Sequence, residues 1–97
     1  MSTLHLTLKK KWFDMILSGI KTEEYREIKP YWTKRFYSKK YHYICFRNGY
    51  ASKAPQFTIE LKSITPSTGK PQWGAEPNKK YFVLYLGKII NTKNIDK

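Results

Sequence analysis

Short stretches with the residue pattern of a β-strand recur along this chain of 97 residues, and one stretch has the pattern of an amphipathic helix. In the first of them, TLHLTL, leucines alternate with polar residues, as in a strand with one buried face. Candidate strands lie at 3–8, 21–28, 41–50, 55–64 and 80–90. This pattern predicts an α+β fold, namely a small mixed β-barrel of about five to six strands with one main helix flanking an opening.

The helical pattern covers residues 9–19, KKKWFDMILSG. Its apolar side chains recur at helical spacing as far as Ile20, and Gly19 stands where a left-handed C-cap ends a helix. The segment 30–40 begins with proline and predicts a turn or a short helix. Proline and glycine in 66–80 predict a long loop. We expect a single domain over residues 1–97, in which the polar residues 91–97 form a frayed, flexible tail.

Composition indicates a globular protein, with 40% hydrophobic residues and a single cysteine, Cys45. The cysteine lies in an apolar run, which predicts a buried thiol in a reducing compartment. No apolar run approaches the length that spans a bilayer, and the first residues lack the charge order of a signal peptide. We therefore expect a cytoplasmic protein with no membrane partner, and we expect a monomer.

The charge of the chain is strongly positive, because 19 Lys and Arg residues face 7 Asp and Glu residues and give a net charge of +12. Such a bias favours a polyanionic partner, since neutralising phosphates releases counterions and gives affinity for any sequence. The alternative is a lysine-rich surface that only keeps the protein in solution. Composition by itself does not choose between these two interpretations.

Opposed charges crowd into the stretch SGIKTEEYREIK, residues 18–29. In a strand, alternate residues share a face, so Glu24 and Arg26 point the same way as Ile28, which marks that face as inward. Lys21 reaches the same place only if the backbone bends after the glycine. Charges there are costly unless they pair with one another or with a ligand. The alternative is an edge strand whose charges prevent aggregation.

Residues 19–26, GIKTEEYR, resemble the G-x-K-x-x-E-x-R signature of the ASCH domain family, which is related to the PUA domain. The strand before the helix and the signature on the following strand also fit that family, over nearly the whole chain. The resemblance implies a PUA-like β-barrel with a cleft between barrel and helix, into which Lys21, Glu24 and Arg26 project. It also implies binding of RNA or a nucleotide-like ligand there.

One branch of small bacterial members of that family hydrolyses the amide of N4-acetylcytidine. That branch uses the signature lysine, a threonine three residues later and a carboxylate from much later in the chain. Lys21 matches the lysine, but Glu24 occupies the position of the threonine. The resemblance therefore favours a binding protein. An amidohydrolase acting on an N-acylated nucleoside, with Lys21 and Glu24 as catalytic residues, is the alternative.

A second group of residues combines cations with aromatic rings, which suits contacts to phosphates and to unstacked bases. The predicted nucleic-acid surface consists of Lys29, Tyr31, Trp32, Lys34, Arg35, Lys39 and Lys40. The alternative is that most of these aromatic rings belong to the core. Arg47 ends a predicted strand, and its planar guanidinium suits a phosphate or a base edge, although a plain surface arginine is an equal alternative.

Three other residues have side chains of a type that can bind a metal or cover a ligand. Trp73, in the long loop, either covers a ligand or pins the loop to the barrel, and we favour pinning. His5 and His42 lie far apart and away from cysteine or carboxylates at ligand spacing, so we expect no metal. No glycine-rich phosphate loop or Ser-His-Asp pattern is present, and we expect no cofactor.

Overall fold

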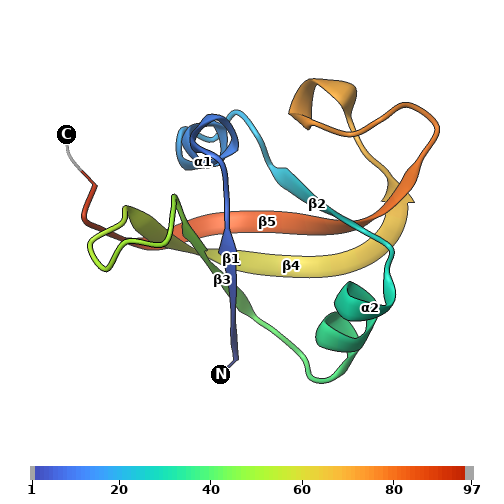
Figure 1. The fold of residues 1–97 in the computed structure, drawn as a ribbon, viewed down its shortest axis with the longest axis horizontal. Helices are drawn as coiled ribbons and strands as arrows, with labels where there is room; N and C mark the ends of the chain where they lie inside the picture. The colour runs from blue at the N-terminus through green and yellow to red at the C-terminus, as the bar shows by residue number, and fades with distance from the viewer. Residues whose placement is uncertain (1, 96–97) are drawn as a thin grey trace.

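A sheet of five strands curls into a half-barrel, and two helices pack against it (Figure 1). The computed structural model describes residues 2–95. In chain order the elements are β1 (Thr3–Thr7), α1 (Lys10–Leu17), β2 (Glu23–Glu27), α2 (Pro30–Tyr37), β3 (Tyr43–Arg47), β4 (Gln56–Thr68), the 3-10 turn η1 (Pro71–Trp73) and β5 (Lys80–Lys93). The predicted α+β class with a mixed, barrel-like sheet is confirmed, and α2 forms where a turn or short helix was predicted.

The strand order is β1-β3-β4-β5-β2, with β1 and β3 parallel and the other pairs antiparallel. The two longest strands, β4 and β5, form one curved hairpin, which runs horizontally across Figure 1. Three register shifts between Thr58 and Ser63 interrupt their ladder. Such irregularities increase local twist and bend a strand, which accounts for the curl of the sheet. Because β1 and β2 stand at the two ends of the strand order, they form the two edges of the half-barrel.

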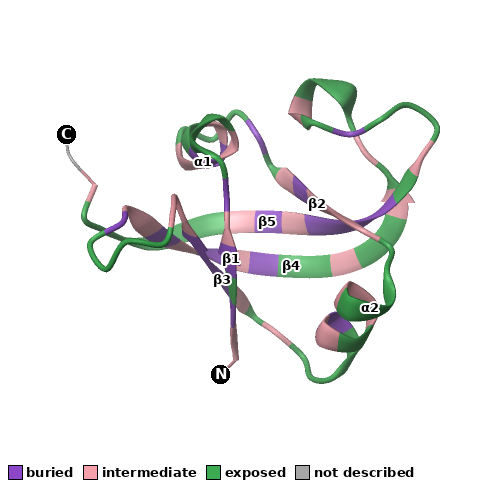
Figure 2. Cartoon of the chain, viewed as in Figure 1, coloured by how far each residue is buried: buried purple, intermediate pink, exposed green. Residues whose placement is uncertain are grey.

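Strands β1, β3, β4 and β5 and both helices contribute side chains to the hydrophobic core, and Figure 2 shows buried segments along β4 and β5. The alternating residues Leu4 and Leu6 of β1 are buried, as predicted, and so are Phe57 and Ile59 of β4. Helix α1 adds Phe13 and Ile16, and α2 adds Phe36. Burying these side chains contributes roughly 1.5–3 kcal/mol each. Each helix is thus held by an aromatic side chain inserted into the sheet.

Two predictions about inward-facing residues differ from the structure. The side chains of Ile20 and Ile28 were expected to face inward, but they are 64% and 47% exposed. Helix α1 ends at Leu17, and Gly19 has a φ of 86°, so the chain turns before Ile20 can continue the helical face. Strand β2 ends at Glu27, which leaves Ile28 outside the ladder.

The expected tail is also shorter than predicted, because β5 continues to Lys93. Its polar end is paired with β4, where Asn91, Thr92 and Lys93 oppose residues 56–58. Backbone pairing therefore extends the strand through residues whose side chains are exposed. Residues 96–97 of the predicted tail lie outside the described residues. Among residues 2–95, neither helix has the length and apolar character needed to cross a bilayer.

Candidate functional site

Lys21 lies in the short connection between α1 and β2, and its side chain is the most unusual in the core. Its backbone N–H donates to the carbonyl of Met15, so the chain folds back after Gly19 and directs Lys21 inward. The residue is only 1% exposed. Its Nζ donates to Oε1 of Glu24 at 2.7 Å and to the carbonyl oxygen of Glu23 at 2.6 Å. The turn predicted as the condition for Lys21 to join Glu24 is therefore present.

Glu24 is the centre of a buried ion-pair cluster on β2. Its Oε1 accepts from Lys21, and its Oε2 accepts from Nη2 of Arg26 at 2.9 Å. The same Nη2 donates to the carbonyl oxygen of Thr7 at 3.3 Å, which joins β2 to β1 across the open side of the half-barrel. Since both carboxylate oxygens are engaged, Glu24 serves to hold the two cations in place.

Burial governs the electrostatics of this cluster. Loss of water around the ammonium group lowers the pKa of Lys21, and the charge and hydrogen bond of Glu24 oppose that shift. Two aromatic rings complete its surroundings, with Nζ 5.5 Å from the ring centroid of Trp12 and 5.2 Å from that of Tyr25. These rings stabilise the cation while keeping water away from it.

Two pockets meet at Arg26, and Thr7 and Arg26 line both. The Trp12 pocket, of about 300 Å³, is further lined by Leu8, Lys9, Trp12, Glu24 and Tyr25. The Trp32 pocket, of about 340 Å³, is further lined by His5, Leu6, Tyr31, Trp32, Arg35 and Tyr50. Each pocket thus combines one tryptophan ring with a shared guanidinium.

Arg26 is incompletely bonded in this position. Its side chain is 19% exposed, and its buried Nε finds no acceptor among residues 2–95. A buried donor without an acceptor costs about 1–3 kcal/mol. A ligand in either pocket could offer Nε a hydrogen-bond acceptor. That bond would offset part of the cost of the unpaired donor.

The predicted nucleic-acid surface divides between the pockets and open surface. Trp32 is half-buried, stacks on Phe36 at 5.3 Å and 27°, and has the guanidinium carbons of Arg26 and Arg35 at 5.2 and 5.6 Å from its ring. Tyr31 is exposed and also lines the Trp32 pocket. The remaining members are lysines on the surface: Lys29, Lys34, Lys39 and Lys40.

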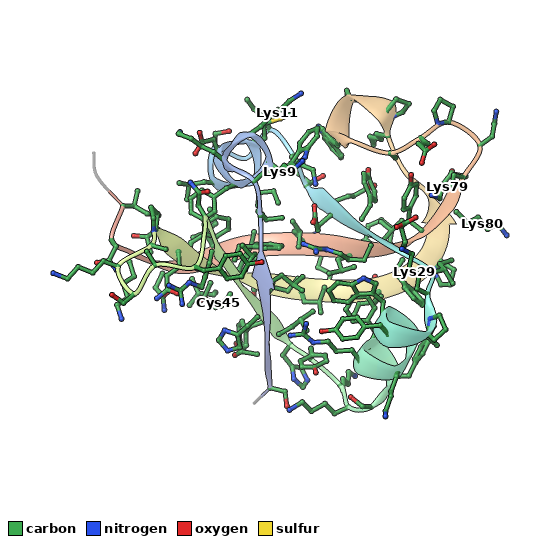
Figure 3. The ribbon with its side chains drawn as sticks, viewed as in Figure 1. Lys9, Lys11, Lys29, Cys45, Lys79 and Lys80 are labelled. Atoms are coloured by element: carbon green, nitrogen blue, oxygen red, sulfur yellow. The ribbon has the colours of Figure 1, made fainter. Side chains whose placement is uncertain are left out.

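Two of these lysines, Lys29 and Lys39, already contact other side chains. Lys29 pairs with Glu27 at 3.0 Å, and Lys79 pairs with the same carboxylate at 2.9 Å. Figure 3 shows Lys29 and Lys79 on the same side of the molecule, where β2 leads into α2. Lys39 lies over the ring of Tyr41 at 5.5 Å, in a separate hollow that Lys40 also lines. Of the four lysines, Lys29 is thus the least available to a ligand.

Arg47 lies away from both pockets. Its Nη2 donates to the carbonyl of Ala51, so the side chain braces the loop after β3. Sequence reasoning missed Trp12, His5 and Tyr50 as pocket residues. Trp12 belongs to the apolar pattern of the predicted helix 9–19, and its position directly after three lysines was the available signal. His5 and Tyr50 meet only because β1 pairs in parallel with β3.

The loop between β4 and β5 packs on β2 and α1 beside the Trp12 pocket. The Lys70 N–H donates to the hydroxyl of Tyr25 at 2.9 Å. A Cβ added to Gly74 would lie 2.9 Å from Cζ2 of Trp12, so the backbone of this loop touches that ring closely. The loop is therefore fixed to β2 and α1 through Lys70 and Gly74. Pinning by Trp73 itself stays a prediction.

No family model, no curated protein and no solved structure matches this chain. Among the residues that the structure describes, no three His, Cys, Asp or Glu side chains come together as a metal ion requires. Function is therefore inferred from the residues and their geometry.

Proposed function

We propose that this chain is an ASCH domain of the PUA-like type that binds RNA or a nucleotide-like ligand at the open side of the half-barrel. One observation carries the proposal: two pockets, each with a tryptophan, share the guanidinium of Arg26, which Glu24 holds in place. The ASCH-like signature in residues 19–26 supplies all three members of the buried cluster. Sequence pattern and geometry thus support the same site.

The chemistry of the pockets suits a nucleic-acid-derived ligand. Tryptophan rings stack on bases with little sequence preference, at about 1–3 kcal/mol per base. Arg26 offers hydrogen bonds to a phosphate or to a carbonyl oxygen of a base. Glu24 fixes the direction of the guanidinium, because its Oε2 occupies one side of Nη2. Lys21 lines neither of these two pockets and supports them indirectly, because it is the second cation that holds Glu24.

The exposed lysines would extend this footprint along a nucleic-acid backbone. Lys34, Lys39 and Lys40 are exposed on α2 and on the segment that follows it. They provide positive charge outside the Trp12 and Trp32 pockets, and Lys39 and Lys40 line a separate hollow beside Tyr41. With a net charge of +12, the chain has the long-range attraction for polyanions that such a footprint needs.

Replacing Arg26 tests the proposal. NMR titration with nucleosides and short oligonucleotides should show binding to the wild type, weakened about tenfold or more in Arg26→Ala. Arg26→Lys keeps the charge but not the planar fork, so it should lie between the two. Lys93→Ala is the matched control, because Lys93 is exposed at the end of β5 and lines neither pocket. Unchanged affinity in Arg26→Ala, with a native circular dichroism spectrum, would contradict the proposal.

The lowered pKa of Lys21 favours one second candidate, an amidohydrolase acting on an N-acylated nucleoside. In that reaction neutral Lys21 takes a proton from water, the resulting hydroxide attacks the acyl carbon, and the C–N bond breaks as the leaving amine gains a proton. Glu24 would shuttle the proton. The hydroxyl residue nearest in sequence, Thr22, is exposed and lines a separate pocket of about 400 Å³ together with Lys21. The Nζ of Lys21 donates to Glu23 and Glu24 and not to the Thr22 hydroxyl, so no threonine nucleophile is proposed.

Turnover separates the two candidates. The protein is incubated with N4-acetylcytidine and related N-acyl nucleosides, and deacylation is followed by mass spectrometry with Lys21→Ala as the control. Product formed by the wild type alone supports the hydrolase. Binding without turnover across the panel leaves the binding function.

A further inference from the structure

The Trp32 pocket differs from the Trp12 pocket in its charge. Arg26 and Arg35 both line it, and the carbons of their guanidiniums lie 5.2 and 5.6 Å from the centroid of the Trp32 ring. Within the part of the chain that the structure describes, no carboxylate lines this pocket. The Trp12 pocket, in contrast, includes Glu24. An anion therefore meets only positive and neutral groups on one side of Arg26 and a carboxylate on the other.

Both arginines are fixed by backbone carbonyls on the free edge of β1. Arg26 donates to the carbonyl oxygen of Thr7 at 3.3 Å, and Nη2 of Arg35 donates to that of His5 at 2.9 Å. Nη1 of Arg35 also lies 3.4 Å from the hydroxyl of Tyr31. These bonds use only part of the donors that a guanidinium carries, and they hold the remaining ones at the pocket.

We propose that the Trp32 pocket is a phosphate subsite, which takes the phosphate of a nucleotide whose base occupies the Trp12 pocket. This inference rests on the proposed function and names its substrate class as a phosphorylated ligand, either a free nucleotide or a phosphodiester in RNA. A phosphate fits here because its oxygens accept parallel hydrogen bonds from planar guanidiniums. Two such groups in one partly enclosed pocket bind an anion more strongly than the same groups on open surface.

The aromatic residues at the rim fit the rest of such a ligand. Tyr50 is 89% exposed and Tyr31 is 63% exposed, and both border the pocket. A volume of about 340 Å³ holds a phosphate and leaves space for part of a sugar. Large exposed rings beside two cations are typical of surfaces that take one nucleotide after another.

The experiment compares each nucleoside with its own monophosphates. Cytidine, uridine, adenosine and guanosine, their 5′- and 3′-monophosphates, and inorganic phosphate are titrated into the full chain, following amide shifts by NMR and tryptophan fluorescence. Arg35→Ala removes the guanidinium that is unique to the Trp32 pocket, and Arg35→Lys keeps its charge. Lys93→Ala removes the same charge outside both pockets. Thermal unfolding establishes that each variant is folded.

Three outcomes are distinguishable. If at least one monophosphate binds about tenfold or more tightly than its nucleoside, and this gain is lost in Arg35→Ala but kept in Lys93→Ala, the subsite is supported. Phosphate alone should then shift the amides of His5 and Tyr50. If nucleosides and monophosphates bind equally, or Arg35→Ala weakens both equally, the subsite is overturned while the proposed function stands. If none of them binds, the subsite is overturned, and the proposed function fails as well when short oligonucleotides do not bind either.

A dinucleotide arm distinguishes the two sources of phosphate. A dinucleotide with one internal phosphodiester that binds as tightly as the best monophosphate supports RNA as the ligand. A monophosphate that binds more tightly than every dinucleotide supports a free nucleotide. Either result supports the subsite only when Arg35→Ala removes the gain, and it overturns the subsite when Arg35→Ala does not.

Discussion

The Nζ of Lys21 lies 2.7 Å from Oε1 of Glu24, and their side chains are only 1% and 9% exposed. A second lysine–carboxylate pair, Lys10 with Asp14, has nearly the same separation, 2.6 Å, but its side chains are 76% and 51% exposed. The two pairs therefore differ mainly in burial. In the buried pair, each charge depends on the other because water cannot replace it.

Replacing Glu24 should destabilise the protein far more than replacing its exposed counterpart. Glu24→Gln leaves the buried Lys21 without its carboxylate, and we expect a loss of about 3–5 kcal/mol in the free energy of unfolding. Asp14→Asn should change it by no more than about 0.5 kcal/mol, because exposed pairs contribute little. Urea denaturation at neutral pH measures both values. Equal losses in the two variants would contradict the structural role assigned to Glu24.

The dependence of stability on pH should reveal Lys21. Burial places the pKa of Lys21 below its ordinary value of 10.5 in the folded chain, so between the two values the unfolded chain binds more protons. The free energy of unfolding contributed by Lys21 therefore rises with pH through that window. The stability difference, wild type minus Lys21→Met, should increase from pH 7 towards 10.5. Tyr25 and the other titrating groups are present in both proteins and largely cancel.

A direct titration makes that prediction independent of how well Lys21→Met folds. In the wild type, the ¹³Cε signal of Lys21 should titrate below the ordinary lysine pKa of 10.5. A Lys21 signal that titrates at that ordinary value, or a stability difference that is flat with pH, would refute the effect of burial.

Local alternation predicted most of the sheet, because residues such as Leu4, Leu6, Phe57 and Ile59 need only a period of two to mark a buried face. Helical spacing failed at Ile20, and alternation failed at Ile28. Periodicity does not indicate where a turn ends a helix or where pairing ends a strand. The polar end of β5 was missed for a related reason, since its order comes from backbone pairing with β4.

The period of two along a strand also predicted part of the site. Glu24 and Arg26 share a face of one strand, so spacing alone placed them together. Lys21 needed the turn after Gly19, which spacing could only suggest. The Trp32 pocket combines β1, β2, α2 and the loop after β3. Contacts between segments so far apart are set by sheet topology, which no short sequence pattern contains.

Salt dependence should separate the outer lysines from the pockets. For a single-stranded oligonucleotide, each neutralised phosphate contributes about 0.7 to the slope of log affinity against log salt. If Lys39 and Lys40 each contact a phosphate, the double variant to alanine should lower that slope by about 1.4. Lys88→Ala/Lys93→Ala, on the exposed part of β5, removes the same charge and should leave the slope nearly unchanged. Equal slopes in wild type and Lys39→Ala/Lys40→Ala would place these lysines outside the footprint.

The contact between Gly74 and Trp12 should make the loop a support for the wall of the Trp12 pocket. Gly49 and Gly74 both have a φ of 100°, but an added Cβ meets nothing within 4 Å at Gly49, whereas at Gly74 it would lie 2.9 Å from Trp12. Gly49→Ala therefore introduces only backbone strain, about 1–2 kcal/mol. Gly74→Ala adds a steric clash of about 1–3 kcal/mol. It should also shift the fluorescence of Trp12, assigned by comparison with Trp12→Phe, and weaken ligand binding. If the two glycine variants lose the same stability and keep the same affinity, the loop does not support the pocket.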